Sequence, residues 1–277
     1  MNKELKSITF SDGVTNRISF FRNQESARKT ILMLPALGVK ASYYDKFCTY
    51  FAENGYHMVS MEWRGLGHSS IRASRKVNFA YKDFLTDIGE VIELIQVELP
   101  NTALYFAGHS LGGQLGALYL SRFPKVAKGL FAIACCSIYY KGWTGRNRLP
   151  ILLAGVLFAP ISNIVGYLPG KQLGFGGKEF RGVMKDWLYT LKTGKYATEG
   201  DNFDYESAMN KATFPILAIS VEYDFMSPYK AVENLLGKFP NASTKHIQIP
   251  NPDKKLNHFR WTKIPQTILD KINEAAI

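Results

Sequence analysis

The pentapeptide Gly108-His109-Ser110-Leu111-Gly112 contains the residue best suited by type and setting to covalent chemistry. The apolar run 103–107 precedes it, and the segment 113–120 repeats apolar residues at helical spacing. This pattern predicts a strand, a tight turn and a helix, with Ser110 in the turn. The flanking glycines permit a strained backbone, and the start of the helix offers unpaired N–H groups to an oxyanion. We therefore interpret Ser110 as a nucleophile.

A serine hydroxyl at neutral pH needs a general base, which is most often a histidine oriented by a carboxylate. Of the five histidines, His258 alone lies in a loop between the last expected strand and the last expected helix. The other four lie in strand patterns, in a Gly-rich turn or beside the serine: His57, His68, His109 and His246. The side chain of His109 is expected to point away from its serine neighbour. His258 is the predicted base.

The matching carboxylate should lie in a loop at the same edge of the sheet. Asp224 follows the apolar run 215–221 directly, so it is the predicted acid, and Glu222 is the second candidate. Asp204 and Asp253 are weaker candidates. A helix-capping or turn function for Asp224 is the structural alternative.

An oxyanion hole needs two fixed N–H donors. The first is expected from Leu111, the residue after the nucleophile, and the second from the loop after an early strand. In that loop Pro35 has no N–H to donate. Leu37 is the predicted second donor, with Ala36 as its alternative.

Apolar runs typical of buried strands alternate along the chain with amphipathic segments typical of helices. The expected strands are a pair within 5–22 and the runs 30–34, 56–61, 103–107, 129–136, 215–221 and 243–249; the expected helices are 41–54, 83–99, 113–120, 228–238 and 264–275. Regular alternation of this kind predicts an α/β fold with a mostly parallel central sheet flanked by helices. Ligands bind such sheets at the carboxyl ends of the strands.

The alternation stops between residues 137 and 211. We expect a core formed by 1–136 and 212–277, and a helical lid formed by 137–211. Residues 149–170 carry no charge and approach the length of a membrane span. Three prolines and three glycines interrupt this stretch, which favours a lid with an apolar underside over a true span.

The chain has 277 residues, an ordinary hydrophobic content of 46% and a net charge of +11. Because the lysines and arginines are scattered, the charge does not indicate nucleic-acid binding, whereas weak contact with an anionic membrane stays open. The cysteines are Cys48, Cys135 and Cys136. Their odd number predicts free thiols and a cytoplasmic protein, and the first eleven residues lack the apolar region of a signal peptide. No spacing of cysteines and histidines indicates a metal site, and no cofactor is expected.

The order serine, aspartate, histidine on a parallel sheet resembles the α/β-hydrolase family over nearly the whole chain. Residues 62–69, Glu-Trp-Arg-Gly-Leu-Gly-His-Ser, resemble that family's D-x-R-G-x-G-x-S turn, and 221–228 resemble its acid loop. The resemblance implies a serine hydrolase with a lid. It also implies Ser110 as nucleophile, His258 as base and Asp224 as acid.

The resemblance also implies Leu37 and Leu111 as oxyanion donors. Pro35-Ala36 stands where many members have His-Gly, Glu62 replaces the usual aspartate, and Asn257 stands where glycine is frequent. Residues 167–174 look like a poorly characterised bacterial branch of predicted hydrolases, which implies no particular substrate.

We expect hydrolysis of a carboxylic ester or thioester of a small or lipid-like acyl group. An acyltransferase or a peptidase would use the same residues. A binding module that holds a ligand without turnover is the alternative from another class. The sequence leaves the acyl length, the leaving group and the oligomeric state open.

Overall fold

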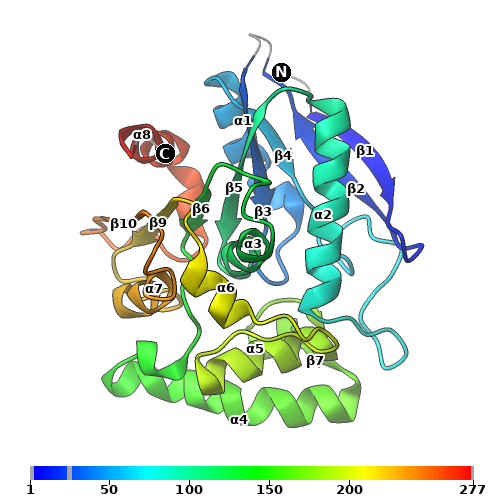
Figure 1. The fold of residues 1–277 in the computed structure, drawn as a ribbon. Coiled ribbons are helices and arrows are strands. Elements are labelled where there is room, and N and C mark those ends of the chain that lie inside the picture. The colour runs from blue at the N-terminus through cyan, green and yellow to red at the C-terminus, as the bar shows by residue number, and fades with distance from the viewer. Residues whose placement is uncertain (1–2, 24–26, 276–277) are drawn as a thin grey trace.

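The structure is a computed structural model that describes residues 3–23 and 27–275, and within them an eight-stranded sheet forms the centre (Figure 1). The strand order is β1-β2-β4-β3-β5-β6-β9-β10. The antiparallel hairpin of β1 and β2 occupies one edge, and the other six strands of this sheet run parallel to one another. The strand bounds are Lys3–Thr9 (β1), Thr15–Phe21 (β2), Lys29–Leu34 (β3), His57–Ser60 (β4), Ala103–His109 (β5), Leu130–Ile133 (β6), Ile216–Val221 (β9) and Thr244–Ile249 (β10). The predicted α/β fold with a mostly parallel sheet is confirmed.

Helices cover both faces of the sheet and divide the core into two apolar clusters. One cluster joins the sheet to α1 and α8, and the other joins it to α2, α3 and α7. The central strands β5 and β9 are buried on both faces, which explains their continuous apolar sequence. The helix bounds are Asp45–Glu53 (α1), Tyr81–Glu98 (α2), Leu111–Arg122 (α3), Tyr229–Leu236 (α7) and Pro265–Glu274 (α8).

The segment 137–211 lies across one end of the sheet (Figure 1). It contains the helices α4 (Arg148–Val165), α5 (Arg181–Thr193) and α6 (Tyr205–Lys211), and the two-stranded hairpin of β7 (Tyr167–Pro169) and β8 (Lys178–Phe180). Helix α4 packs on α5, whereas α6 packs on α3. The sequence predicts a lid here, and that assignment stays a prediction.

Helix α4 is continuous through Pro160, although the prolines of this stretch suggest interruption. Within the described ranges, one helix is long and apolar enough to cross a membrane by length and composition, the segment Gly145–Val165, with a mean hydropathy of 1.7. Only 17% of its most apolar window is buried. The solvent-facing side of this helix is therefore apolar as well as the side that faces the rest of the protein, whereas the sequence suggests an apolar underside.

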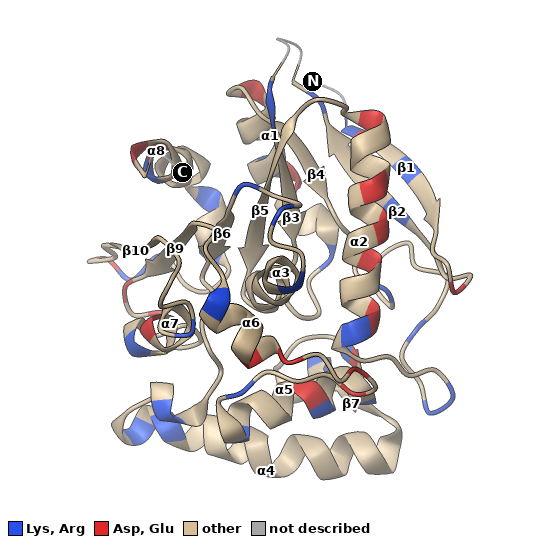
Figure 2. Ribbon diagram, in the orientation of Figure 1, with Lys and Arg blue, Asp and Glu red and all other residues tan. Residues whose placement is uncertain are grey.

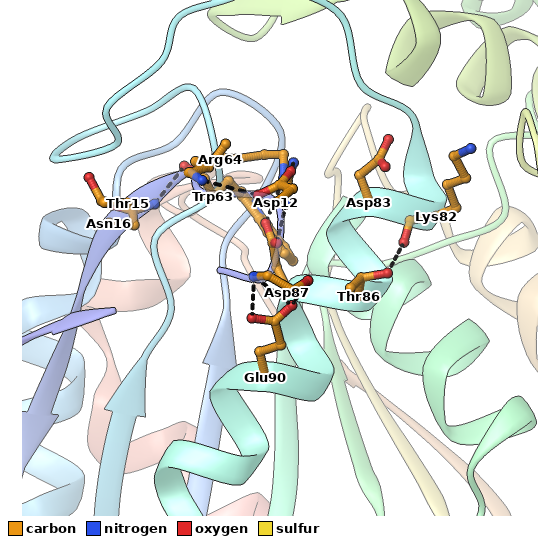
Figure 3. A network of polar contacts seen from close by, with 12 residues as sticks. Asp12, Thr15, Asn16, Trp63, Arg64, Lys82, Asp83, Thr86, Asp87 and Glu90 are labelled. Atoms are coloured by element: carbon orange, nitrogen blue, oxygen red, sulfur yellow. Dashed lines mark hydrogen bonds and ion pairs between the residues drawn. The ribbon is translucent and has the colours of Figure 1, made fainter. Parts of the chain in front are cut away.

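A buried ion-pair network holds the turn that follows β4 (Figure 3). Arg64 donates through Nε to Asp87 Oδ2 at 2.7 Å and through Nη1 to Asp12 Oδ2 at 2.7 Å, and a second bond joins Nη2 to Asp87 Oδ1. Arg64 and Asp87 are buried, so the pairing offsets the cost of removing both charges from water. The network fixes the turn to α2 and to the β1–β2 hairpin. Trp63 of the same turn donates to the carbonyl of Pro35 at 2.8 Å and so reaches the loop after β3.

Candidate active site

Ser110 lies at a strained corner between β5 and α3. Its φ is +52° and its ψ is −117°, a combination that residues other than glycine rarely adopt. Neighbouring glycines make the corner possible: a Cβ on Gly108 would lie 2.3 Å from the Cα of Gly113, and one on Gly112 would lie 2.1 Å from the carbonyl oxygen of Leu34. The strand, turn and helix predicted around Ser110 are therefore present.

His258 and Asp224 form a buried pair at the carboxyl ends of the strands. His258 lies in the loop after β10, and Asp224 follows β9. The distance from His258 Nδ1 to Asp224 Oδ2 is 2.9 Å, and both residues are 4% exposed. Asp224 Oδ1 also accepts the N–H of Met226 at 2.9 Å, which fixes the carboxylate. The other ring nitrogen, His258 Nε2, has no hydrogen-bond partner among the described residues.

The other candidate carboxylates form contacts away from His258. Glu222 accepts the N–H of Asn251 at 3.0 Å and holds the next loop. Asp204 caps the amino end of α6, and Asp253 is an exposed partner of Lys255. Among the described residues none of these three contacts His258, whereas Asp224 does, so the geometry favours Asp224.

The loop after β3 offers one of its N–H groups to the site. The N–H of Ala36 donates to Tyr44 Oη at 3.0 Å, so it is already occupied. No acceptor for the N–H of Leu37 is present within residues 3–23 and 27–275. The N–H of Leu111, at the first position of α3, has no partner within its helix. These contacts favour Leu37 over Ala36 as an oxyanion donor.

Ser110 and His258 face the same cavity, which has a volume of about 340 Å³. Apolar side chains form most of its wall, with contributions from the loop after β3, from the segment 137–211 and from the loops around Asp224 and His258. Those from α4 and α5 are Pro150, Ile151, Ala154, Phe158 and Trp187. The cavity therefore suits an apolar group beside the serine hydroxyl.

Comparison with known proteins supports the hydrolase class that the sequence suggests. The family model described as serine aminopeptidase, S33, matches residues 25–159. Monoglyceride lipase of Mus musculus is 20% identical over 277 residues, which cover 98% of this chain and 89% of the mouse protein. The chain has the α/β-hydrolase fold and is similar to hydrolases of the esterase and lipase type.

Solved structures show the same fold for this hydrolase. A soluble variant of monoglyceride lipase from Saccharomyces cerevisiae, in complex with a substrate analog, superposes with a TM-score of 0.72 at 15% identity, covering 99% of this chain and 94% of that one. Est1E from Butyrivibrio proteoclasticus, with ferulic acid bound, gives a TM-score of 0.69 at 18% identity over 97% and 98% of the two chains.

A buried tyrosine links the parts of the hydrolase site. Besides accepting from Ala36, Tyr44 Oη lies 2.7 Å from His109 Nδ1, and the His109 ring centroid lies 4.9 Å from that of His258. Burial lowers the pKa of His109 well below its usual value, and the neighbouring His258 acts in the same direction. His109 is therefore neutral, and a single proton is shared in the hydrogen bond between Tyr44 Oη and His109 Nδ1. The sequence does not single out Tyr44, because nothing local marks a tyrosine that will bridge two loops.

A buried carboxylate lies against the loop that carries Leu37. Glu179 of β8 is 5% exposed, accepts the N–H of Gly177 at 2.5 Å, and has no cationic partner in the part of the chain that the structure describes. A Cβ on Gly38 would lie 2.2 Å from the nitrogen of Gly177, so the two backbones touch. Burial raises the pKa of Glu179 to about 7, against the opposing effect of the bond from Gly177.

This carboxylate predicts a pH dependence of stability. In the unfolded chain Glu179 ionises near 4.5, whereas in the folded chain it keeps its proton until about pH 7. The folded state binds the extra proton between these values, so the free energy of unfolding falls as the pH rises through this window. We expect Glu179→Gln, which preserves an acceptor for Gly177, to be more stable relative to the parent at pH 8 than at pH 5 by about 2–3 kcal/mol.

Urea unfolding of both proteins at pH 5 and pH 8 measures this difference. Exposed Glu199 provides the matched control, because Glu199→Gln should change stability equally at the two pH values. An identical pH dependence for the parent and Glu179→Gln would show that Glu179 does not titrate in this window.

Proposed function

We propose that the protein hydrolyses carboxylic esters or thioesters of apolar acyl groups, with Ser110 as nucleophile, His258 as general base and Asp224 as the acid that orients it. The observation that carries this proposal is the 2.9 Å pair of His258 and Asp224 beside the same apolar cavity as the strained Ser110. The similarity of the chain to lipases and esterases is consistent with this proposal.

The reaction begins when Ser110 Oγ attacks the acyl carbon and His258 Nε2 takes the hydroxyl proton. The carbonyl oxygen becomes an oxyanion, which accepts hydrogen bonds from the N–H groups of Leu37 and Leu111. His258 then gives its proton to the leaving oxygen or sulfur, and the bond from carbon to that atom breaks. Water then attacks the acyl carbon and loses a proton to His258, which passes that proton to Ser110 Oγ as the bond from Oγ to the acyl carbon breaks and the acid is released. Asp224 holds the Nδ1–H tautomer throughout and stabilises the imidazolium.

The composition of the cavity favours apolar acyl esters over peptides with a free amino end. No aspartate or glutamate occurs among the described residues that line it, so a charged amino group would be desolvated without a partner. The mouse relative is named a monoglyceride lipase, so a monoacylglycerol is a natural first substrate to assay. Acyl transfer to an acceptor other than water uses the same steps. The three cysteines are free and buried, which suits the reducing compartment expected from the sequence.

A series of p-nitrophenyl esters from acetate to dodecanoate tests the proposal. We expect kcat/KM to rise with acyl length until the cavity is filled, because each buried methylene contributes about 0.8 kcal/mol. Amino-acid p-nitroanilides should be turned over far more slowly. A flat response to acyl length, or preferential cleavage of the anilides, would contradict this assignment of substrate class.

Tyr44 is expected to act as a positioning residue. Tyr44→Phe retains the ring but removes both contacts of the hydroxyl, which frees the N–H of Ala36 and the Nδ1 of His109. We expect kcat to fall about tenfold with little change in KM, because about 1–1.5 kcal/mol of hydrogen bonding is lost beside the oxyanion loop.

Steady-state kinetics on one soluble ester measures this effect, and Tyr56→Phe is the control. Tyr56 precedes β4, at the opposite end of the sheet, and its hydroxyl donates to Asn273 at 2.9 Å. An equal loss of kcat in both variants would assign a purely structural role to Tyr44.

A further inference from the structure

The outer face of helix α4 is an apolar stripe exposed to solvent. Its members lie at positions i, i+3, i+4, i+7, i+8 and i+15 of the helix, and each is 40–71% exposed: Leu149, Leu152, Leu153, Val156, Leu157 and Ile164. Such a stripe normally faces the core of a protein. Here a different set of residues faces the core, and it includes Ile151, Ala154 and Phe158, which line the cavity.

The inner contacts of α4 show how this helix can meet a lipid surface. Gly155, Phe158 and Ser162 are buried, and the helix packs along α5. A helix held along one side cannot be surrounded by lipid without breaking those contacts. Its geometry therefore suits a helix that lies in the plane of a membrane surface with one side immersed.

The charges around the stripe have one sign. Residues 137–198 contain nine lysines and arginines, of which Lys185 pairs with Glu199 just beyond this range, and their only acids, Glu179 and Asp186, are both buried. Lys141, Arg146 and Arg148 lie at the amino end of α4, where Figure 2 shows the basic positions beside an otherwise uncharged helix. At the carboxyl end, exposed Arg75 donates to the carbonyl of Ile164.

We propose that the outer face of α4 docks on an anionic lipid surface, with the apolar stripe immersed at the level of the headgroups and the basic side chains at both helix ends contacting lipid phosphates. A second copy of the chain fits less well, because it would present the same positive charges to this face. Since α4 also forms one wall of the cavity, docking brings that cavity to the membrane. The proposal concerns the outer face and is independent of which ester the site accepts.

Vesicle flotation tests the apolar stripe. We expect the protein to float with vesicles of phosphatidylcholine and phosphatidylglycerol, and to float much less with phosphatidylcholine alone. The double variant Leu153→Asp, Val156→Asp should reduce the bound fraction about tenfold or more. Val97→Asp is the control, because Val97 is 76% exposed on α2, outside the stripe. Hydrolysis of a soluble short-chain ester should persist in all of these proteins, since none of the three side chains lines the cavity.

A pair of charge reversals tests the basic positions. Lys141→Glu with Arg146→Glu, both exposed at the amino end of α4, should reduce binding to the anionic vesicles about tenfold, and added salt should have a similar effect. Lys125→Glu with Lys128→Glu changes the net charge equally near the amino end of β6, and should reduce binding much less.

Several results would overturn the proposal. These are absence of flotation, equal binding to neutral and anionic vesicles, and equal loss in the test and control variants. Concentration-dependent dimerisation that Val156→Asp abolishes would assign the stripe to a second copy instead. Each result concerns binding alone, so it is distinguishable from failure of the ester-hydrolysis proposal, which the soluble substrate reports.

Discussion

Ser110→Ala is expected to lower kcat for a soluble ester by at least about 10⁴-fold, because covalent catalysis needs the hydroxyl at the strained corner. Ser110 has a positive φ and a cavity in front of its side chain, and the first N–H groups of α3 lie behind it. Alanine removes the attacking oxygen and leaves the backbone, the cavity and the oxyanion donors in place. The residual rate then comes from the polarised carbonyl alone.

Ser220 provides a demanding control for this variant. Its hydroxyl lies 2.8 Å from His246 Nε2, and His246 Nδ1 lies 2.5 Å from Glu233, so these residues resemble a second triad. Ser220 is fully buried in β9 and does not line the cavity of Ser110, so a substrate in that cavity does not reach it. Ser220→Ala should retain near-parental kcat. Loss of activity in Ser220→Ala, with activity retained in Ser110→Ala, would reverse the assignment.

Asp224→Asn is expected to lower kcat by about 10³–10⁴-fold with a modest change in KM. The amide can donate toward His258 Nδ1, which favours the wrong tautomer and places the proton on the nitrogen that must accept it from Ser110. The neutral amide also cannot stabilise the imidazolium. Because Asp224 is buried, solvent cannot replace either contribution.

Glu222→Gln is the matched control for Asp224→Asn. Its carboxylate also follows β9, but it accepts from Asn251 outside the cavity, and the amide oxygen preserves that acceptor. Steady-state kinetics should therefore show near-parental kcat for Glu222→Gln. A comparable loss in both variants would show that the loop, and not the charge on Asp224, matters for the rate.

Much of the fold could be predicted because strands buried on both faces require continuous apolar runs. The runs at 30–34 and 215–221 became β3 and β9 within a residue of the expected ends. The run at 129–136 gave a shorter strand, β6, which ends at Ile133. Ala134 has a φ of +43°, a local conformation that the apolar character of the run does not reveal.

The proposed site was predictable where it depends on loop order, and hidden where it depends on packing. Asp224 and His258 follow strands whose carboxyl ends must meet at one edge of a parallel sheet, so their proximity follows from topology. The link from Ala36 through Tyr44 to His109 depends on how α1 packs, which no short-range pattern encodes. Likewise, a helix that is apolar all round does not show in its sequence which side faces the core.

Mapping of a fluorophosphonate label by mass spectrometry tests the central claim most directly, because the probe reacts with a serine only when that serine is activated. We predict a single modified residue, Ser110, in the folded protein. Labelling should be lost in Ser110→Ala and His258→Ala and should remain in Ser220→Ala. Absence of label in the folded parent protein, or a label on another serine, would contradict the account.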